Sequence, residues 1–207
     1  MRRNLRGGLL ALALVAGGAA TSAAQETGTP IFKAPYRAFQ THEFGVSLSD
    51  PGGDTGIDFA LEGFYRYGKG ANDFSLRGGF ADGAGNIDTK LLLGGDFRTQ
   101  VVSYSESFPL DGSITLGLGT SIGDGPDKFY LPVGISLGRR FDMEGSNTTF
   151  VPYLHPVVIP TFGSGDDDVN FALGLGVDIR FSDQWAVRAS GGLGDLDGVG
   201  ISVAYIR

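Results

Sequence analysis

The last forty residues, Asp168 to Arg207, read DVNFALGLGVDIRFSDQWAVRASGGLGDLDGVGISVAYIR. Apolar side chains hold alternate positions over 171–181, 185–193 and 199–205, and short turns near 182–184 and 194–198 separate these runs. A period of two is typical of β-strands whose two faces meet different surroundings. This stretch therefore predicts three antiparallel strands joined by tight turns.

The same alternation extends over most of the chain and no helical period of any length interrupts it. Gly, Asp, Asn and Pro, which favour turns, separate the runs. We predict an all-β fold, an antiparallel up-and-down transmembrane β-barrel of about ten strands. The ten predicted strands span residues 43–49, 56–67, 73–81, 87–98, 112–122, 128–141, 148–161, 169–181, 185–194 and 198–206.

Prolines make one part of this prediction ambiguous. Pro152, Pro156 and Pro160 share one phase of the segment 148–161, and Pro132 lies inside 128–141. Proline cannot donate to a strand ladder, and a closed barrel has no free edge to hold it. The alternatives are a bent or bulged strand here, or a barrel of eight strands with an irregular region. Residues 99–111 could also extend the fourth strand.

Charged residues gather on the face opposite the apolar one. In contact with lipid, each Arg or Lys would cost about 2–4 kcal/mol at the bilayer midplane, so we expect these groups to line the lumen and pair across it. A soluble barrel or sandwich would show the same period with its apolar face inward, and remains the alternative. The predicted lumen network comprises Asp58, Glu62, Arg66, Arg77, Asp88, Lys90, Asp96, Arg98, Asp178, Arg180 and Arg188.

Aromatic residues recur in one phase at one end of the predicted strands. Flat amphipathic rings at strand ends are typical of the girdle that transmembrane barrels place at headgroup depth. The predicted girdle comprises Tyr65, Tyr67, Phe97, Phe141, Phe181, Trp185 and Tyr205.

The N-terminus carries the pattern of an export signal. Arg2, Arg3 and Arg6 precede an uncharged apolar run, and Ser22-Ala23-Ala24 offers small residues at a cleavage site. We predict a signal peptide over 1–24, an N-terminal periplasmic segment over 25–42 and the barrel over 43–207. The 207 residues suit one domain, contain no Cys for disulfides, and carry a net charge of −7 that argues against nucleic-acid binding.

The C-terminal strand resembles the closing strand of outer-membrane β-barrel proteins of Gram-negative bacteria, the porin-like and small-barrel group. In Gly198-Val199-Gly200-Ile201-Ser202-Val203-Ala204-Tyr205, the Gly, apolar and aromatic positions of that signal are held by Gly200, Val203 and Tyr205. Gly198 departs from the usual polar residue, and Ile206-Arg207 follow the aromatic. The resemblance implies residence in the outer membrane, contact with its lipid and lipopolysaccharide, and recognition by the barrel-assembly machinery.

Residues suited to catalysis or metal binding are sparse. We expect His155 to be a hydrogen-bonded interior residue, because neither His155 nor His42 has the partner spacing of a catalytic site. Asp166, Asp167 and Asp168 form an acidic run that could bind a hard cation, but a solvated turn is the default. We therefore predict no catalytic site, no cofactor and no metal.

The predicted function is a non-enzymatic integral outer-membrane barrel, structural or with narrow porin-like passage of small solutes. The alternative is a β-barrel binding module for an apolar small molecule, in the membrane or secreted.

Overall fold

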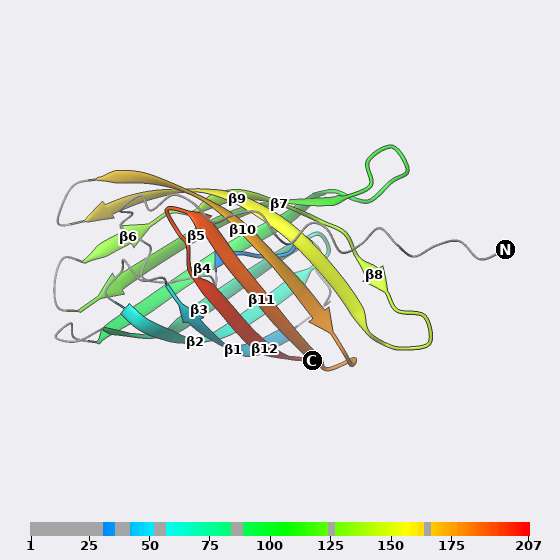
Figure 1. Ribbon diagram of the computed structural model, residues 1–207, viewed down its shortest axis with the longest axis horizontal. Coiled ribbons are helices and arrows are strands. Elements are labelled where there is room, and N and C mark those ends of the chain that lie inside the picture. Colours follow the sequence, from blue (N-terminus) through cyan, green and yellow to red (C-terminus); the bar gives the residue numbers. More distant parts are fainter. Residues whose placement is uncertain (1–30, 36–41, 52–56, 84–88, 124–126, 164–166) are drawn as a thin grey trace.

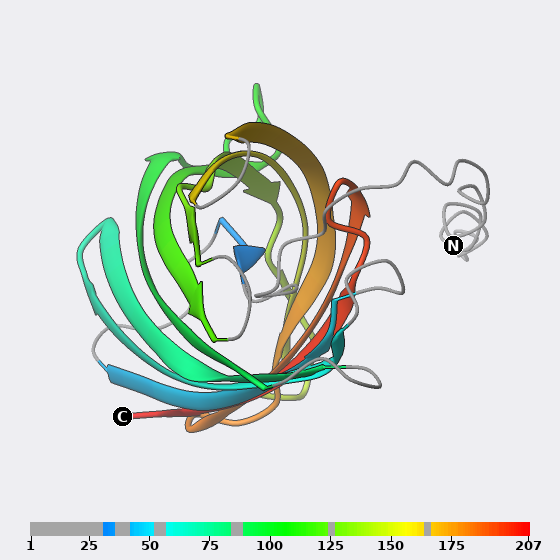
Figure 2. The ribbon, with the colours of Figure 1, turned by 90° about the vertical axis from the view of Figure 1, so that its left-hand side faces the viewer.

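The computed structural model describes residues 31–35, 42–51, 57–83, 89–123, 127–163 and 167–207. Twelve antiparallel strands form one sheet, which Figures 1 and 2 show curved into a barrel. No helix in the described ranges is long and apolar enough to span a membrane. The strands are β1 (His42–Asp50), β2 (Ile57–Lys69), β3 (Asn72–Gly83), β4 (Lys90–Val102), β5 (Asp111–Ile122), β6 (Lys128–Tyr130), β7 (Val133–Gly138), β8 (Phe141–Asp142), β9 (Thr149–Gly163), β10 (Asp168–Arg180), β11 (Trp185–Gly194) and β12 (Val199–Ile206).

The barrel closes between its first and last strands. β12 pairs with β1 from Glu43↔Ile206 to Asp50↔Val199. Two main-chain hydrogen bonds between His42 and Arg207, of 3.0 and 2.8 Å, continue this seam to the rim. We call this end of the barrel the terminal rim and the other end the opposite rim. Closure gives each described wall strand a neighbour on both sides, so the described part of the wall has no free edge strand.

The prediction of ten strands around the barrel is confirmed, and the eight-strand alternative is wrong. β6 and β7 are two parts of one barrel position, interrupted at Leu131 and Pro132, since both lie between β5 and β9. β8 only extends the hairpin with β9 beyond the wall. The fourth strand continues to Val102, which resolves part of the ambiguous stretch 99–111.

The proline-rich segment is an intact strand, β9, because its prolines all face the same neighbour. The carbonyls of Pro152 and Pro160 accept hydrogen bonds from Arg139 and Leu131, on the β6–β7 side. Main-chain groups four residues apart point to the same side of a strand, so Pro156 shares that direction. The main-chain N–H donors that proline lacks are therefore missing only from the pairing of β9 with β6 and β7. On its other side β9 pairs with β10 over thirteen positions, from Thr149 to Thr161.

The barrel turns apolar side chains outward and ionic ones inward. Leu116 and Leu175 are each 46% exposed, whereas Asp178 is 8% exposed and faces the interior. The soluble alternative with an apolar interior and a charged exterior is therefore wrong for this fold.

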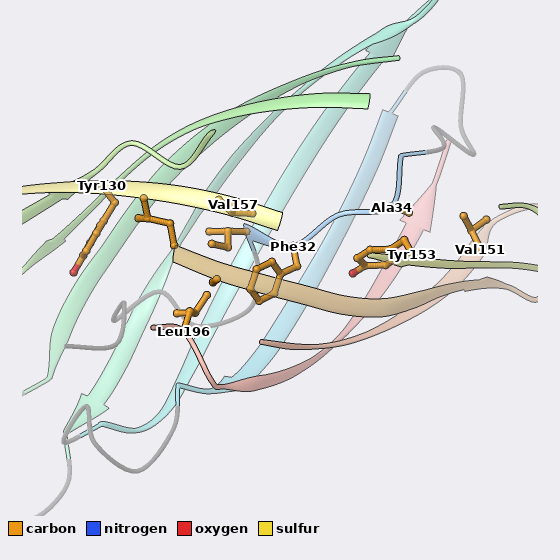
Figure 3. Packing of buried hydrophobic residues seen from close by; sticks show 10 residues of the cluster. Phe32, Ala34, Tyr130, Val151, Tyr153, Val157 and Leu196 are labelled. Carbon is orange, nitrogen blue, oxygen red and sulfur yellow. The ribbon is translucent and has the colours of Figure 1, made fainter. Parts of the chain in front are cut away.

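A short N-terminal segment lies inside the barrel. Residues 31–35 run through the lumen, drawn in blue inside the ring of strands in Figure 2. Ile31, Phe32 and Ala34 are buried in a cluster that also contains Leu196 from the β11–β12 turn (Figure 3). The sequence had assigned these residues to a periplasmic segment, 25–42, and had not predicted their place in the lumen. The predicted signal peptide, 1–24, lies outside the described residues.

Candidate functional site: a filled lumen

Ten charged side chains form a network across the lumen, five acidic and five basic, so their formal charges cancel. They project inward from β1, β2, β3, β4, β10 and β11, and one comes from the segment 31–35. The members are Glu43, Glu62, Asp73, Asp96 and Asp178 with Lys33, Arg66, Arg77, Arg98 and Arg188. Buried charges need such partners, since an isolated one would cost several kcal/mol.

Close pairs formed by Arg98 and Arg188 lie toward the terminal rim. The Arg98 guanidinium donates to one carboxylate oxygen of Asp73 from two nitrogens, at 2.8 and 2.7 Å. Arg188 contacts Glu43 at 2.6 Å and Asp178 at 3.0 Å, so one guanidinium joins strands on both sides of the β11–β12–β1 seam. The pairs Arg98–Asp73 and Arg188–Asp178 join strands that are already ladder neighbours, whereas Arg188–Glu43 links β11 to β1 across β12.

Other pairs of the network are longer and leave space. Arg66 lies 3.7 Å from Glu43 and 3.8 Å from Asp73, and Arg77 lies 3.9 Å from Glu62. Among the described residues neither carboxylate oxygen of Glu62 has a hydrogen-bond partner. A cavity of about 50 Å³ adjoins these groups, large enough for a few water molecules that could bridge them.

Wall side chains bind the main chain of residues 31–35. Ser136 of β7 donates to the Lys33 carbonyl and Arg98 of β4 to the Ala34 carbonyl. Ser113 of β5 donates to the Pro35 carbonyl. This segment belongs to no strand ladder, so these hydrogen bonds satisfy main-chain groups that would otherwise be buried without partners.

His155 of β9 completes the binding of this segment, and the prediction of a hydrogen-bonded interior His is confirmed. The imidazole is 1% exposed, and its Nδ1 accepts from the Lys33 amide at 3.2 Å. Nε2 therefore carries the proton of the neutral ring and donates to Thr115 Oγ1 at 2.7 Å. Both ring nitrogens are occupied, so the ring positions the segment.

Two side chains of the segment are held by the wall. The Lys33 ammonium pairs with Asp96 and donates to Ser75 Oγ at 3.2 Å. The Phe32 ring lies over glycines of β10 and β11: a Cβ built on Gly174 would overlap the ring, and one on Gly192 would lie 2.9 Å from it. At Gly174 any side chain would displace the aromatic ring, and at Gly192 it would also overlap the main-chain carbonyl of Leu196.

Seven of the eleven predicted lumen residues belong to the network: Glu62, Arg66, Arg77, Asp96, Arg98, Asp178 and Arg188. Lys90 and Arg180 are half-buried at opposite ends of their strands, and Arg180 contacts Asp183 at 3.7 Å in the β10–β11 turn. Asp58 is exposed, because a register shift between Ile57 and Phe59 ends the regular alternation of β2. Asp88 lies outside the described residues.

Three members of the network are absent from the predicted eleven: Glu43, Lys33 and Asp73, although Asp73 does lie on the charged phase of its predicted strand. Glu43 alternates with the outward Phe44 and Val46 of β1, so the period of two did carry a signal for it. Lys33 had no such signal, because the segment around it has no period and its partner Asp96 is remote in the sequence.

The seven predicted girdle residues lie at or near the terminal rim, most of them in two cross-strand rows. One row is Trp185, Tyr205, Phe44 and Tyr65, which are consecutive register neighbours across β11, β12, β1 and β2. The other is Tyr67, Phe74 and Phe97, across β2, β3 and β4. Phe141 and Phe181, 48% and 49% exposed, lie at the ends of their hairpins. Ring pairs connect neighbours within both rows: Trp185–Tyr205 at 5.3 Å and Phe44–Tyr65 at 5.0 Å in the first, and Phe74–Phe97 at 4.9 Å in the second.

The acidic run shows no metal centre in its described part. Asp167 and Asp168 are exposed, and Asp168 accepts a hydrogen bond from the Val169 amide at 2.7 Å, while Asp166 lies outside the described residues. Within the described ranges no three His, Cys, Asp or Glu side chains gather as a metal site.

A closed antiparallel barrel with an apolar exterior, an ionic interior and aromatic rows at one rim is the architecture of a transmembrane β-barrel. The chain belongs to the family described as outer membrane protein beta-barrel domain, whose profile matches residues 9–205.

Solved structures similar to the chain include two transmembrane barrels. A de novo designed transmembrane β-barrel matches with 16% sequence identity and a TM-score of 0.41, covering 82% of this chain and 97% of the design. The β domain of the Bordetella autotransporter Brka matches with 14% identity and a TM-score of 0.48, covering 81% of this chain and 100% of that domain. Comparison with curated protein sequences finds no match.

Proposed function

We infer that this chain is a non-enzymatic integral barrel of the Gram-negative outer membrane, with a lumen closed by its own residues and a structural role. Passage through it is limited to small solutes at most. The observation that carries this inference is the filling of the lumen by residues 31–35 together with the ten-charge network. The spaces beside them are cavities of about 50 and about 10 Å³. Cavities of this size between described residues hold a few water molecules, in contrast to the aqueous channel of a wide porin.

The test is conductance in planar lipid bilayers, with folding verified first by heat-modifiable gel migration. The wild-type chain is expected to show no steady open state. A large, steady conductance of the folded wild-type chain would contradict the closed lumen.

A cysteine pair provides a matched control within one polypeptide, since the chain has no native Cys. A Cβ built on Gly174 would overlap Phe32 Cγ, the atom bonded to the Phe32 Cβ. The two Cβ atoms of the pair Phe32→Cys/Gly174→Cys are therefore within the separation of about 4 Å that a disulfide can span. The oxidised form, with the segment fixed to β10, is expected to be as silent as wild type. The reduced form has lost the Phe32 ring and is expected to open more often.

Contacts with the membrane follow from the same architecture. The outward apolar face would meet lipid, and the exposed acids at the opposite rim would meet lipopolysaccharide through divalent cations. Calcium should then raise the melting temperature of the wild-type protein in lipopolysaccharide and not that of the Asp166/Asp167/Asp168→Ala variant. Absence of a calcium effect in wild type would remove this idea.

The assembly machinery would recognise β12, which closes the barrel against β1. Tyr205→Ala should therefore slow the appearance of the heat-modifiable form in cells more than Tyr104→Ala, a change outside β12 and beyond the barrel wall. Equal rates for the two variants would argue against recognition through Tyr205.

The alternative function, binding of an apolar small molecule, is supported by no observation in the described lumen. The apolar part of the lumen is occupied by side chains of the protein itself, namely Phe32, Leu196 and their neighbours (Figure 3). The larger cavity is lined mainly by charged and serine side chains.

A further inference from the structure

We propose that the lumen wall is a binding site for a short peptide, occupied in cis by residues 31–35. The site recognises an apolar and aromatic pair followed by a lysine, and it binds the same sequence supplied in trans. The segment that closes the lumen is then a ligand that another peptide of the same sequence can replace, which goes beyond the closed barrel proposed above.

The first argument is that side chains of the wall hydrogen-bond to the main chain of the peptide. Four wall side chains, from β4, β5, β7 and β9, bind four nearly consecutive main-chain groups of the segment. The amide and carbonyl of Lys33 are bound by His155 and Ser136, and the next two carbonyls by Arg98 and Ser113. Hydrogen bonds to main-chain groups give affinity, while pockets for side chains give specificity.

The second argument is that the wall has a recess for each large side chain. Gly174 and Gly192 leave room for the Phe32 ring, where a Cβ would collide with it. Asp96 and Ser75 receive the Lys33 ammonium, which is buried with its partner and would be unfavourable there without it. An aromatic side chain followed by a basic one is therefore the pattern that the wall selects.

The third argument is that the barrel wall is complete without the segment. Residues 31–35 pair with no strand, and the seam between β12 and β1 closes the wall by itself. The segment therefore contributes to the lumen as an occupant rather than as a component of the sheet.

A tethered occupant competes at an effective concentration near millimolar, so exchange has to be measured after the tether is cut. A protease site introduced within residues 36–41 of the full chain allows the tether to be cleaved after folding. The nicked protein, verified by heat-modifiable migration, is then passed over a sizing column in detergent. The fragment that contains residues 31–35 is expected to stay with the barrel.

Exchange is followed with a fluorescent peptide of the sequence TPIFKAPY, residues 29–36, added to the nicked protein. Saturable binding with release of the resident fragment is expected. The matched peptide with Lys33→Glu places a carboxylate against Asp96 and should bind at least 10-fold more weakly. A nicked Ser136→Ala barrel, which lacks one main-chain donor, should bind the native peptide several-fold more weakly.

Four results would each overturn the proposal: loss of the fragment on nicking without binding in trans, a fragment that no excess of peptide displaces, equal binding of both peptides, or unfolding of the barrel on nicking. The last would make the segment part of the folding core. These experiments do not measure the conductance of the intact chain. They can therefore contradict the peptide site without contradicting the closed lumen.

Discussion

Replacing Arg98 with Met tests whether the lumen network stabilises the barrel. Arg98 is 2% exposed and donates at 2.8 and 2.7 Å to Asp73, which is 1% exposed. After the substitution the nearest cation to Asp73 is Arg66, at 3.8 Å. A carboxylate with all its water removed would then depend on one distant partner.

The expected cost follows from that burial. Removal of one partner of a buried ion pair destabilises by about 3–5 kcal/mol, because the other charge is left uncompensated. The lost hydrogen bond to the Ala34 carbonyl adds about 1 kcal/mol. Arg140 provides the matched control: it lies 2.7 Å from Asp142, but the two side chains are 38% and 64% exposed. Such a surface pair contributes about 0–1 kcal/mol, so Arg140→Met should cost little.

The assay is reversible unfolding by urea in lipid vesicles, followed by the fluorescence of Trp185, the single tryptophan of the chain. Arg98→Met should lower the free energy of unfolding by several kcal/mol more than Arg140→Met. The double variant Arg98→Met/Asp73→Asn should recover part of the loss, since it removes the uncompensated charge. If both single variants unfold like wild type, or lose equal stability, the network does not stabilise the fold as described.

Three further outcomes are expected. Gly174→Ala should cost about 1–3 kcal/mol by overpacking against Phe32, and a urea midpoint unchanged from wild type would contradict the recess. In hydrogen-exchange mass spectrometry, amides of the β7–β9 seam, which has four register pairs, should exchange faster than those of β9–β10, which has thirteen; equal protection would argue against a weak seam. Trp185, 43% exposed in its aromatic row, should be quenched more by lipids brominated near the headgroup than at mid-chain, and the reverse order would displace the girdle from the interface.

Much of the fold could be predicted because strand direction is a local property. Successive side chains of a strand point to opposite faces. The alternation therefore predicted Leu116 outward and Asp178 inward without any knowledge of the neighbouring strands. The exception, Asp58, lies at a register shift, where one unpaired residue changes the phase. Such shifts depend on pairing with a neighbouring strand and leave no mark in a single run of sequence.

The proline-rich strand shows how a correct rule can mislead when it is applied to one strand alone. Proline does remove a ladder donor, as expected. Its cost depends on which neighbour loses the bond, and the spacing of Pro152, Pro156 and Pro160 directs every loss to the interrupted β6–β7. That partner is known only once strand order is fixed.

The sequence by itself determined the architecture, because each strand carries its own two-faced pattern and ten such patterns close into a barrel. Only the tertiary structure decided what fills that barrel. Lys33 lies in a segment without any period. Its amide bonds to His155, 122 residues away, and its side chain pairs with Asp96. Partners across a lumen are chosen by the shear and diameter of the closed wall, and those quantities exist only after all the strands have paired.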